Sequence, residues 1–462
     1  MKYHPYKLTR RDFMTIMGLT TAGLFFRPSG IAQPLRVLGS NGRYLTQVAA
    51  TRHNDYEQAL IRQKVEYLFN QLGGIGDIMG TGDKVAIKIN LTGGSYWASH
   101  QNLQGTDIRE CAWTHPEVLR AVGELVIDQG VNPSDIYIVE ALWDDDSYND
   151  YGYLDVQNYL GAQRVNLNQA APYAGFANIS TGDDPFFYSY FIMNQVLGEV
   201  DAFISIPKMK HHYEAGTTQS MKNLVGSVPL QFYQMPGNTG TRSALHQEGG
   251  AVSYHLPRSI CDLNMARPVH LAVIDGIKNA VGGEGPWNPT FTPSEYDFLL
   301  AGKDPVATDS IATLIMGLNP EAEQLELPTG LDCDNHLWLA HQKGMGTNIL
   351  SEIQLVGDGA GAILGVDDDG ESPGFSNGPR IYPNYPNPFR SYTSIKYHIP
   401  SDSEVTVEIL EPSGKLIVQL EKGWKNSGDH LTGWSARNMP AGTYFCRLSA
   451  NGRTVIRKLL VK

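Results

Sequence analysis

Cysteine is scarce in this sequence, and the few copies lie far apart. The 462 residues contain four, namely Cys111, Cys261, Cys333 and Cys446, and no two of them form a C-x-x-C pair. Iron–sulfur clusters and structural zinc sites usually take closely spaced cysteines, so we expect no in-chain iron–sulfur cluster. We predict buried free thiols, with one disulfide among the first three as the alternative in an oxidising compartment.

Basic residues are also in short supply. Lys and Arg number 36 against 48 Asp and Glu, which gives a net charge of −12, and the first 32 residues alone carry +4. Binding to nucleic acid or to an anionic membrane needs clustered Lys and Arg. We therefore predict no nucleic-acid partner, and any anion site must be a local exception to the acidic balance.

Long apolar runs are missing after the N-terminus, so we predict no transmembrane span in the mature chain. The N-terminus itself has Arg10-Arg11 and Phe13, then a short apolar run over residues 14–26. This pattern predicts an export signal over residues 1–32, with Gly30-Ile31-Ala32 as a cleavage site. The signal resembles the twin-arginine type, although Thr15 stands where a Lys is usual. An ordinary secretory signal is the alternative.

Three familiar catalytic motifs are absent from residues 33–357. That region has no P-loop of the form G-x-x-x-x-G-K-[ST], no G-x-S-x-G nucleophile elbow and no H-E-x-x-H. The glycine-rich turn around Glu284 is therefore not a P-loop, and the other two absences disfavour an ordinary serine hydrolase and a zinc protease.

Short β-rich runs alternate with helical patterns over residues 33–357. This alternation predicts an α/β fold, mainly a parallel sheet with flanking helices, whose ligand site lies past the carboxyl ends of the strands. Asp304 precedes Pro305 as the N-cap of a helix. The predicted strands are 85–89, 135–139, 202–206 and 270–274, and the clearest helix is 116–129.

Composition changes after the α/β region. Residues 358–380 are rich in Gly, Asp, Ser and Pro and read as a linker, with a calcium loop at 367–371 as the alternative. Residues 381–462 contain short alternating strands separated by turns, which predicts a C-terminal all-β immunoglobulin-like sandwich. We therefore expect two folded domains.

Several motifs follow one another in order in this C-terminal segment. They are Tyr385-Pro386-Asn387-Pro388-Phe389, Gly428-Asp429, Trp434, Ala441-Gly442-Thr443-Tyr444 and the terminal Val461-Lys462. Together they resemble the type IX secretion C-terminal sorting domain. The resemblance implies the secretion machinery as a partner and delivery to the cell surface or the medium, with a periplasmic accessory domain as the alternative.

Polar segments punctuated by glycine follow the predicted strands of the α/β region. The segments are 88–90, 207–212 with 216–226, 275–277 with 282–286, and 302–309. Thr114-His115 begins a helix, and we expect the start of this helix to point at the site that these segments form. In this order they resemble the domain-of-unknown-function family 362 over about residues 45–357. The resemblance implies a fold but no established reaction. A second histidine, His212, and an insertion at about 95–110 depart from the family pattern.

Four lysines in these segments stand out in so acidic a chain. Cations that meet at strand ends focus a positive potential on a phosphate or carboxylate, and a buried lysine with a lowered pKa can act as a base. In the alternative, each lysine reaches solvent separately or pairs with Asp275 or Asp309. We predict that the structure brings together Lys88, Lys208, Lys210 and Lys222.

The site residues follow from these segments. We predict a catalytic group of Lys208, Lys210, His211 and Asp275, and cofactor-binding residues Lys88, Asn90, Lys222, Asn223, Gly283 and Gly285. His211 is a ligand or proton carrier, or else a structural histidine. Asp309 and Glu284 are the candidate ligands for a divalent metal, with a structural ion pair equally open for Asp309.

The sequence thus predicts an exported protein that binds a small anionic ligand or an anionic organic cofactor, with or without a metal, at a Lys/His/Asp site. The alternative is a non-catalytic surface protein that binds a glycan, peptide or partner. The tyrosines at 148, 151, 153 and 159 would then supply the binding surface.

Overall fold

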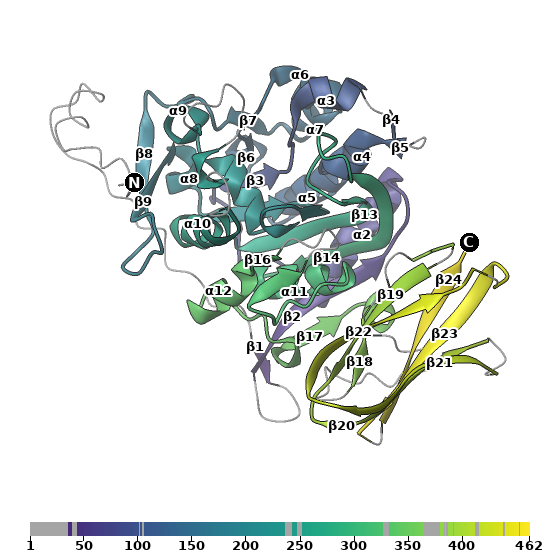
Figure 1. The fold of residues 1–462 in the computed structure, drawn as a ribbon. Helices are drawn as coiled ribbons and strands as arrows, with labels where there is room; N and C mark the ends of the chain where they lie inside the picture. The colour runs from purple at the N-terminus through teal and green to yellow at the C-terminus, as the bar shows by residue number, and fades with distance from the viewer. Residues whose placement is uncertain are drawn as a thin grey trace.

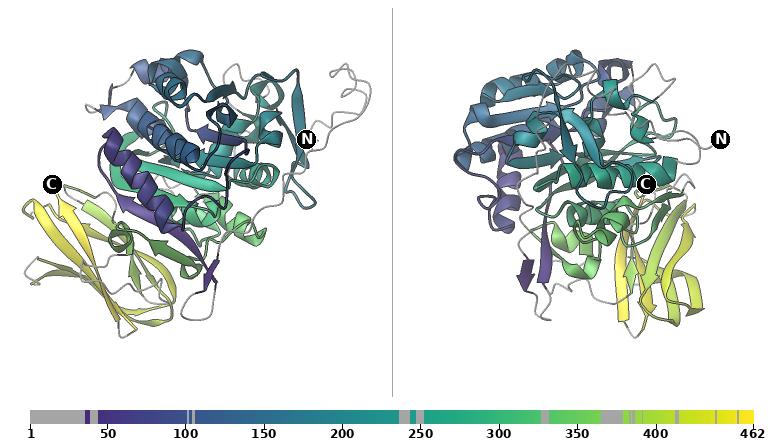
Figure 2. Two further views of the ribbon diagram at one scale, coloured as in Figure 1. Left: turned by 180° about the vertical axis from the view of Figure 1, so that it is seen from behind. Right: turned by 90° about the vertical axis from the view of Figure 1, so that its left-hand side faces the viewer.

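The computed structural model describes residues 36–38, 44–100, 102–103, 106–235, 243–246, 252–326, 332–364 and, with short gaps, 379–462. Figures 1 and 2 show a helix-covered sheet and, beside it, a separate body of strands at the C-terminal end. The predicted export signal and the acidic segment 367–371 lie outside the described residues.

The central sheet of the described residues confirms the predicted α/β architecture. Its order is β1-β2-β14-β13-β10-β3-β6-β7, and the run from β13 to β7 is parallel. The parallel strands are β13 (Leu271–Val281), β10 (Ala202–Ile206), β3 (Val85–Ile89), β6 (Ile136–Glu140) and β7 (Gln163–Asn166). The antiparallel strands are β14 (Thr292–Gly302), β2 (Tyr44–Arg52) and β1 (Arg36–Leu38), and β17 (Ile353–Val356) joins β2 in parallel.

The central strands are buried on both faces, because helices cover each side. Alternate residues of a strand point to opposite faces. In β3, Val85 and Ile87 therefore pack with α2 (Gln58–Gln71) and α5 (Pro116–Asp128) in one core. Ala86 packs in a second core with α10 (Val252–Ala266) and α12 (His336–Gln342).

Two expectations about local structure are confirmed and one strand was predicted too short. The Asp304 carboxylate caps α11 (Pro305–Ile315) by accepting from the Ala307 N–H at 3.0 Å. Strands β3 and β10 have the predicted bounds. Strand β13 runs on to Val281, well past the predicted end at 274, and carries the chain into the glycine-rich turn before β14.

The remaining elements of the α/β part connect the strands or line their ends. They are α3 (Gly94–His100), β4 (Asn102–Leu103), β5 (Thr106–Asp107), α4 (Ile108–Ala112), η1 (Pro133–Asp135), α6 (Asp145–Asp150), α7 (Tyr153–Leu160), β8 (Phe176–Ser180), β9 (Tyr190–Asn194), α8 (Val196–Glu199), β11 (Lys208–His212), β12 (Gly216–Thr218), η2 (Lys222–Ser227), α9 (Leu230–Tyr233), η3 (Ala244–His246), β15 (Gln324–Glu326), β16 (Asp332–Asp334), η5 (Leu350–Glu352) and α13 (Ala360–Leu364).

The C-terminal body is the predicted all-β region. One sheet contains β18 (Arg380–Ile381), β19 (Tyr392–Ile399) and β22 (Gly428–Ser435), and the other contains β20 (Ser403–Leu410), β21 (Leu416–Lys425), β23 (Gly442–Ala450) and β24 (Arg453–Val461). All pairings within the two sheets are antiparallel. Their inward residues, such as Ile395, Val407 and Leu448, share one core, as expected of a sandwich.

The four cysteines are buried and free, which confirms the thiol prediction and not the disulfide alternative. Within the described ranges, none of the helices combines the length and the apolar character that a membrane crossing requires.

Candidate functional site

The carboxyl ends of the parallel strands gather polar residues from distant parts of the chain. Lys88 lies near the end of β3, and Glu140 is the last residue of its neighbour β6. Pro207 ends β10, but the chain continues directly as β11, where Lys208 pairs with Asp275 of β13. Residues of four strands, β3, β6, β11 and β13, therefore meet at one edge of the sheet, as the parallel topology predicts.

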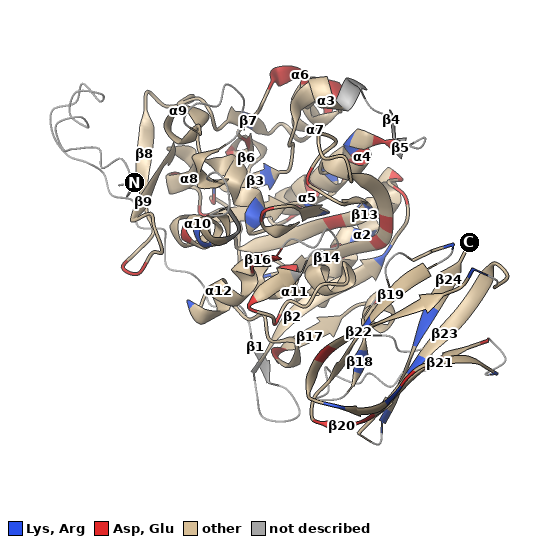
Figure 3. Ribbon diagram, in the orientation of Figure 1, with Lys and Arg blue, Asp and Glu red and all other residues tan. Residues whose placement is uncertain are grey.

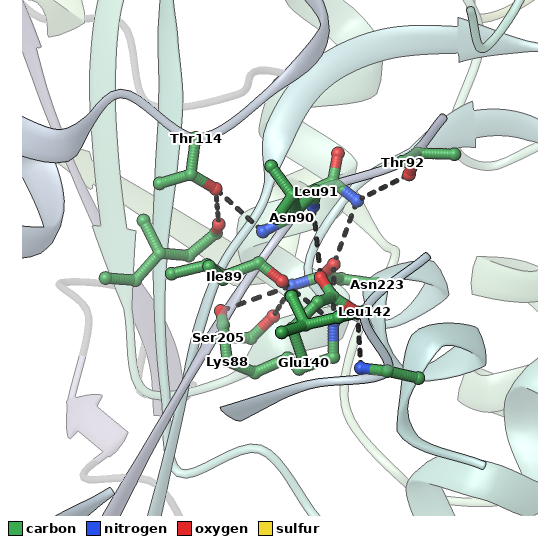
Figure 4. A network of polar contacts seen from close by, with 12 residues as sticks. Lys88, Ile89, Asn90, Leu91, Thr92, Thr114, Glu140, Leu142, Ser205 and Asn223 are labelled. Atoms are coloured by element: carbon green, nitrogen blue, oxygen red, sulfur yellow. Dashed lines mark hydrogen bonds and ion pairs between the residues drawn. The ribbon is translucent and has the colours of Figure 1, made fainter. Parts of the chain in front are cut away.

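Lys88 and Glu140 form a buried ion pair (Figure 4). The Lys88 Nζ lies 2.8 Å from Glu140 Oε1 and also donates to the carbonyl of Ile89 at 2.8 Å. The two oxygens of Glu140 accept from the N–H groups of Ala141 and Leu91, each at 3.0 Å. Burial lowers the pKa of Lys88 and raises that of Glu140, while their mutual attraction opposes both shifts. The Lys88 charge is thus already balanced by the protein.

An amide network extends from this pair (Figure 4). The Asn90 Nδ2 donates to Asn223 Oδ1 at 3.1 Å, and the Asn223 Nδ2 donates to the Ser205 hydroxyl at 3.1 Å. Asn90 Oδ1 is buried without a hydrogen-bond partner. Buried polar atoms are nearly always paired in native proteins, so this oxygen is a candidate contact for a ligand or a water.

Lys208 and Asp275 form a second buried ion pair. The Lys208 Nζ lies 2.8 Å from Asp275 Oδ2, and both side chains have no exposed surface. Tyr56 joins them, because Lys208 Nζ donates to its hydroxyl oxygen at 2.6 Å and that hydroxyl donates to Asp275 Oδ1 at 2.8 Å. Asp275 also accepts from the His115 N–H at 2.9 Å. The alternative in which a lysine pairs with Asp275 is therefore correct for Lys208.

The start of α5 does point at this place, as expected from its sequence. The His115 ring stacks on Tyr56 with centroids 3.7 Å apart and planes 4° from parallel. Burial lowers the pKa of His115 to about 4, so its imidazole is neutral at pH 7. Its Nδ1 accepts from the Glu117 N–H at 3.2 Å and caps the helix.

Lys210 differs from the other two buried lysines. Its Nζ donates to the carbonyl of Ala112 at 2.8 Å, and no carboxylate in the described residues forms an ion pair with it. Burial, reinforced by the charge of Lys222, lowers the pKa of Lys210 to about 7. Thr218 lies directly across from it on β12, and the Thr218 hydroxyl is buried without a hydrogen-bond partner. Among the described residues, no carboxylate thus contacts this ammonium directly, and the Thr218 hydroxyl belongs to the residue opposite it.

His211 and His212 lie on opposite faces of β11, as the extended segment requires. The His211 Nδ1 accepts from the Gly282 N–H at 3.3 Å, and its Nε2 is buried without a partner. His212 Nδ1 accepts from the Glu214 N–H at 3.1 Å, and its ring stacks on that of His246. Burial lowers the pKa of His211 to about 4, so it is a neutral group.

Lys222 and Asn223 enter the site on η2, which a buried carboxylate holds in place. Asp309 accepts from the N–H and hydroxyl of Ser220 at 2.9 and 2.5 Å and from the Met221 N–H at 2.9 Å. The charge of Lys222 lowers the pKa of Lys210, so the two ammonium groups influence each other electrostatically. Asp309 therefore positions the segment that carries two predicted site residues.

We expect Asp309→Asn to destabilise the protein by about 1–3 kcal/mol, because buried N–H or O–H groups lose part of their acceptor. Asp262 is a matched control, since it also accepts three hydrogen bonds, from the N–H groups of residues 186–188 at 2.7–2.9 Å. Hydrogen exchange should accelerate at residues 220–221 in Asp309→Asn and at residues 186–188 in Asp262→Asn. Equal exchange at 220–221 in both variants would contradict the positioning role.

The glycine-rich turn before β14 packs against a tryptophan. Gly283 has φ +137°, which only glycine adopts readily. A Cβ on Gly285 would lie 2.3 Å from a ring atom of Trp287, so the site of this glycine is filled by that ring. Glu284 Oε1 accepts from Trp287 Nε1 at 2.9 Å. The backbone conformation of Gly283 and the packing of Gly285 against Trp287 thus each require a glycine without any bound cofactor.

The described residues contain no group of three or more His, Cys, Asp or Glu side chains arranged to hold a metal ion. The two carboxylates predicted as metal ligands have other partners. Asp309 binds the Ser220–Met221 segment, and Glu284 binds Trp287 and, at 3.4 Å, the Tyr213 N–H. The metal assignment stays a prediction.

We call the polar residues at this edge the strand-end cluster: Lys88, Asn90, Glu140, Lys208, Lys210, Asn223 and Asp275. Sequence analysis missed Glu140 and Tyr56. Glu140 had a signal, because it follows the predicted strand 135–139 directly; Tyr56 had none. The tyrosine-rich region that would serve a surface-binding protein lies largely inside, since Tyr148 and Tyr153 belong to the core.

Two family matches agree with the resemblances predicted from the motifs. Residues 85–313 match the Domain of unknown function (DUF362), and residues 383–462 match the Secretion system C-terminal sorting domain. The sorting domain indicates export to the cell surface or the extracellular space and interaction with the secretion machinery. The twin-arginine type of the signal stays a prediction.

The chain is similar to the thylakoid-associated protein sll1697 of Synechocystis sp., with 27% identity over 274 residues that cover 59% of this chain and 75% of that protein. Among solved structures, it aligns with an endo-β-1,4-mannanase from Thermotoga petrophila at 10% identity and a TM-score of 0.22, over 93% of this chain and 98% of that one. A TM-score this low does not indicate a shared fold.

Proposed function

We propose that this exported protein, which carries a domain of unknown function 362 and a secretion system C-terminal sorting domain, binds a small anionic ligand at the strand-end cluster. The proposal covers a carboxylate or phosphate compound, either a substrate or an organic cofactor. The Lys210 ammonium would be its main contact.

The observation that carries the proposal is the contrast among the three buried lysines. Lys88 and Lys208 each have a carboxylate at 2.8 Å, whereas Lys210 donates only to a backbone carbonyl. A buried charge without a counter-charge is costly, and a bound anion would supply one. The Thr218 hydroxyl opposite Lys210 has no partner within the described residues and can donate to an anion, whereas the unpartnered Asn90 Oδ1 can accept from a hydroxyl group of the same ligand or from a water.

The same contrast separates the predicted catalytic residues into a neutralised ion pair and residues that still have hydrogen-bonding capacity. Lys208 and Asp275 neutralise each other, so they support the site and do not offer a free charge. Lys210, with a pKa of about 7, can both bind an anion when protonated and accept a proton when neutral. His211 has an unpaired Nε2 and remains a candidate hydrogen-bonding group. Among these residues, Lys210 is thus our choice for a proton acceptor.

Replacing Lys210 by Met should weaken the binding of acetate or inorganic phosphate roughly 10- to 150-fold, the range for one charge-assisted hydrogen bond. Titration calorimetry of the full chain measures this directly. Lys84→Met is the matched control, because Lys84 pairs with Glu199 at the surface and lies at the other end of β3. Wild-type protein that binds neither anion, or a Lys210→Met variant that binds both normally, would overturn the proposal.

The natural ligand can be sought without assuming its identity. Protein purified from its natural host should release a carboxylate or phosphate compound on denaturation, detected by mass spectrometry. The Lys210→Met variant purified in the same way should release less of it, and equal release from both would place the compound elsewhere.

A further inference from the structure

Three tryptophans from three separate segments of the chain contact one another. Trp97 lies on α3, Trp143 follows β6, and Trp287 lies in the turn between β13 and β14. The Trp143 and Trp287 rings are 5.8 Å apart and only 19° from parallel, and Trp97 meets Trp287 edge-on at 5.8 Å. Figure 1 shows α3 and α6 close to one another at the top of the molecule, and Figure 3 shows acidic residues on α6.

Trp287 is held in the middle of this group by close packing. A Cβ on Gly93, which has φ +108°, would lie 2.6 Å from the Trp287 ring, and one on Gly285 would lie 2.3 Å from it. Two glycine backbones therefore flank the indole, and any larger side chain at either position would displace it. Close packing against these two glycines thus fixes the position of the Trp287 ring.

The tryptophan group is linked to β11, the strand that carries Lys210, through the glycine-rich turn before β14. Glu284 of this turn accepts from Trp287 Nε1 at 2.9 Å and from the N–H of Tyr213, the residue after β11, at 3.4 Å. In the same turn, the Gly282 N–H donates to Nδ1 of His211, the residue after Lys210, at 3.3 Å. The tryptophans and Lys210 thus lie on segments of the chain that contact each other.

We propose that the exposed part of Trp143, which stacks on Trp287, forms a stacking subsite for an aromatic ring, so that the ligand of this site is an aromatic carboxylate or aryl phosphate. This inference rests on the proposed anion-binding function and specifies its ligand. Trp143 has 37% of its surface exposed, so part of the indole is open to a partner. Aromatic rings pair favourably in offset-stacked or edge-on arrangements, and both geometries already occur within this group.

The polar groups beside Trp143 favour an aromatic ring over a sugar. Asp144 accepts from the N–H groups of Ser95 and Ser147 at 2.8 and 2.7 Å, and Asp145 pairs with Arg164. Sugar recognition needs hydrogen-bonding partners for several hydroxyl groups, and each oxygen of Asp144 already accepts from a backbone N–H. Trp287 Nε1 is engaged as well, by Glu284.

The test compares matched probes with and without a ring: benzoate against acetate, and phenyl phosphate against inorganic phosphate. Wild-type protein should bind each ring-bearing probe more tightly than its simple partner. Trp143→Ala should weaken benzoate and phenyl phosphate roughly 2- to 12-fold, the range for an aromatic pair, and leave acetate and phosphate unchanged. Trp143→Phe should retain most of the difference. Trp424→Ala, at a 70% exposed tryptophan of β21, is the control and should change nothing.

The outcomes separate this inference from the function on which it rests. If acetate and phosphate bind through Lys210 but the ring adds no affinity, the stacking subsite is wrong and anion binding stands. A sugar phosphate could instead bind more tightly than inorganic phosphate in wild-type protein and lose this advantage in Trp143→Ala. If phenyl phosphate shows no such advantage, the proposed ligand class is wrong. If none of the anions binds, both proposals fail.

Discussion

Replacing Asp275 by Ala should lower the free energy of unfolding by about 3–5 kcal/mol, the largest stability effect that we expect from a single substitution in this site. The variant leaves the Lys208 ammonium fully buried, with the Tyr56 hydroxyl oxygen as its remaining hydrogen-bond partner among the described residues. It also removes the acceptor of the Tyr56 hydroxyl and of the His115 N–H. Urea denaturation followed by circular dichroism measures the loss.

A second substitution distinguishes the buried charge from lost packing. The double variant Lys208→Met with Asp275→Ala should be more stable than Asp275→Ala alone, because no charge is then left unpaired. Asp77→Ala removes the partner of Lys303, 2.7 Å away, where Asp77 is 42% exposed, and should cost less than about 1 kcal/mol. If the Asp275→Ala variant is as stable as Asp77→Ala, the Lys208–Asp275 pair contributes little to the free energy of unfolding.

The affinity for acetate should fall about 50-fold between pH 7 and pH 9. Burial and the charge of Lys222 lower the pKa of Lys210 to about 7, so about half of the protein carries the ammonium at pH 7 and about 1% at pH 9. Acetate suits the measurement because its own charge is constant over this range. Calorimetric titrations at half-unit intervals provide the profile.

Two variants check that the profile belongs to Lys210. Lys210→Arg keeps a positive charge throughout, so any acetate binding that it retains should be independent of pH from 7 to 9. Lys84→Met should keep the wild-type profile. A flat profile in the wild-type protein would mean that Lys210 is not the group that binds the anion.

The same titration affects stability with the opposite sign. The folded-state pKa of Lys210 lies below the ordinary lysine value of about 10.4, so the unfolded chain binds more protons between the two values. The contribution of this group to the free energy of unfolding therefore increases with pH across that window, by at most about 1.4 kcal/mol per pH unit. Comparison of wild type with Lys210→Met isolates it. Anion binding would oppose this trend at lower pH.

Periodicity and turn chemistry were enough to predict much of the architecture. The runs Val85–Ile89 and Ala202–Ile206 are short and wholly apolar apart from Lys88 and Ser205, which is typical of strands buried on both faces. Asp304 before Pro305 specified a helix start because both residues act locally on the first turn. The sorting domain could be predicted because its motifs fall in order within 80 residues.

The sequence by itself thus determined the fold class, the sorting domain and the fact that lysines follow the strands, since each depends on residues close together in the chain. Only the tertiary structure decided which lysines are neutralised. Glu140 reaches Lys88 because β6 lies beside β3, and Asp275 reaches Lys208 because β11 runs along β13. Strand order is set by the packing of whole elements and not by local spacing, so the partner of a buried charge, and the lysine left without one, emerge only when the sheet is assembled.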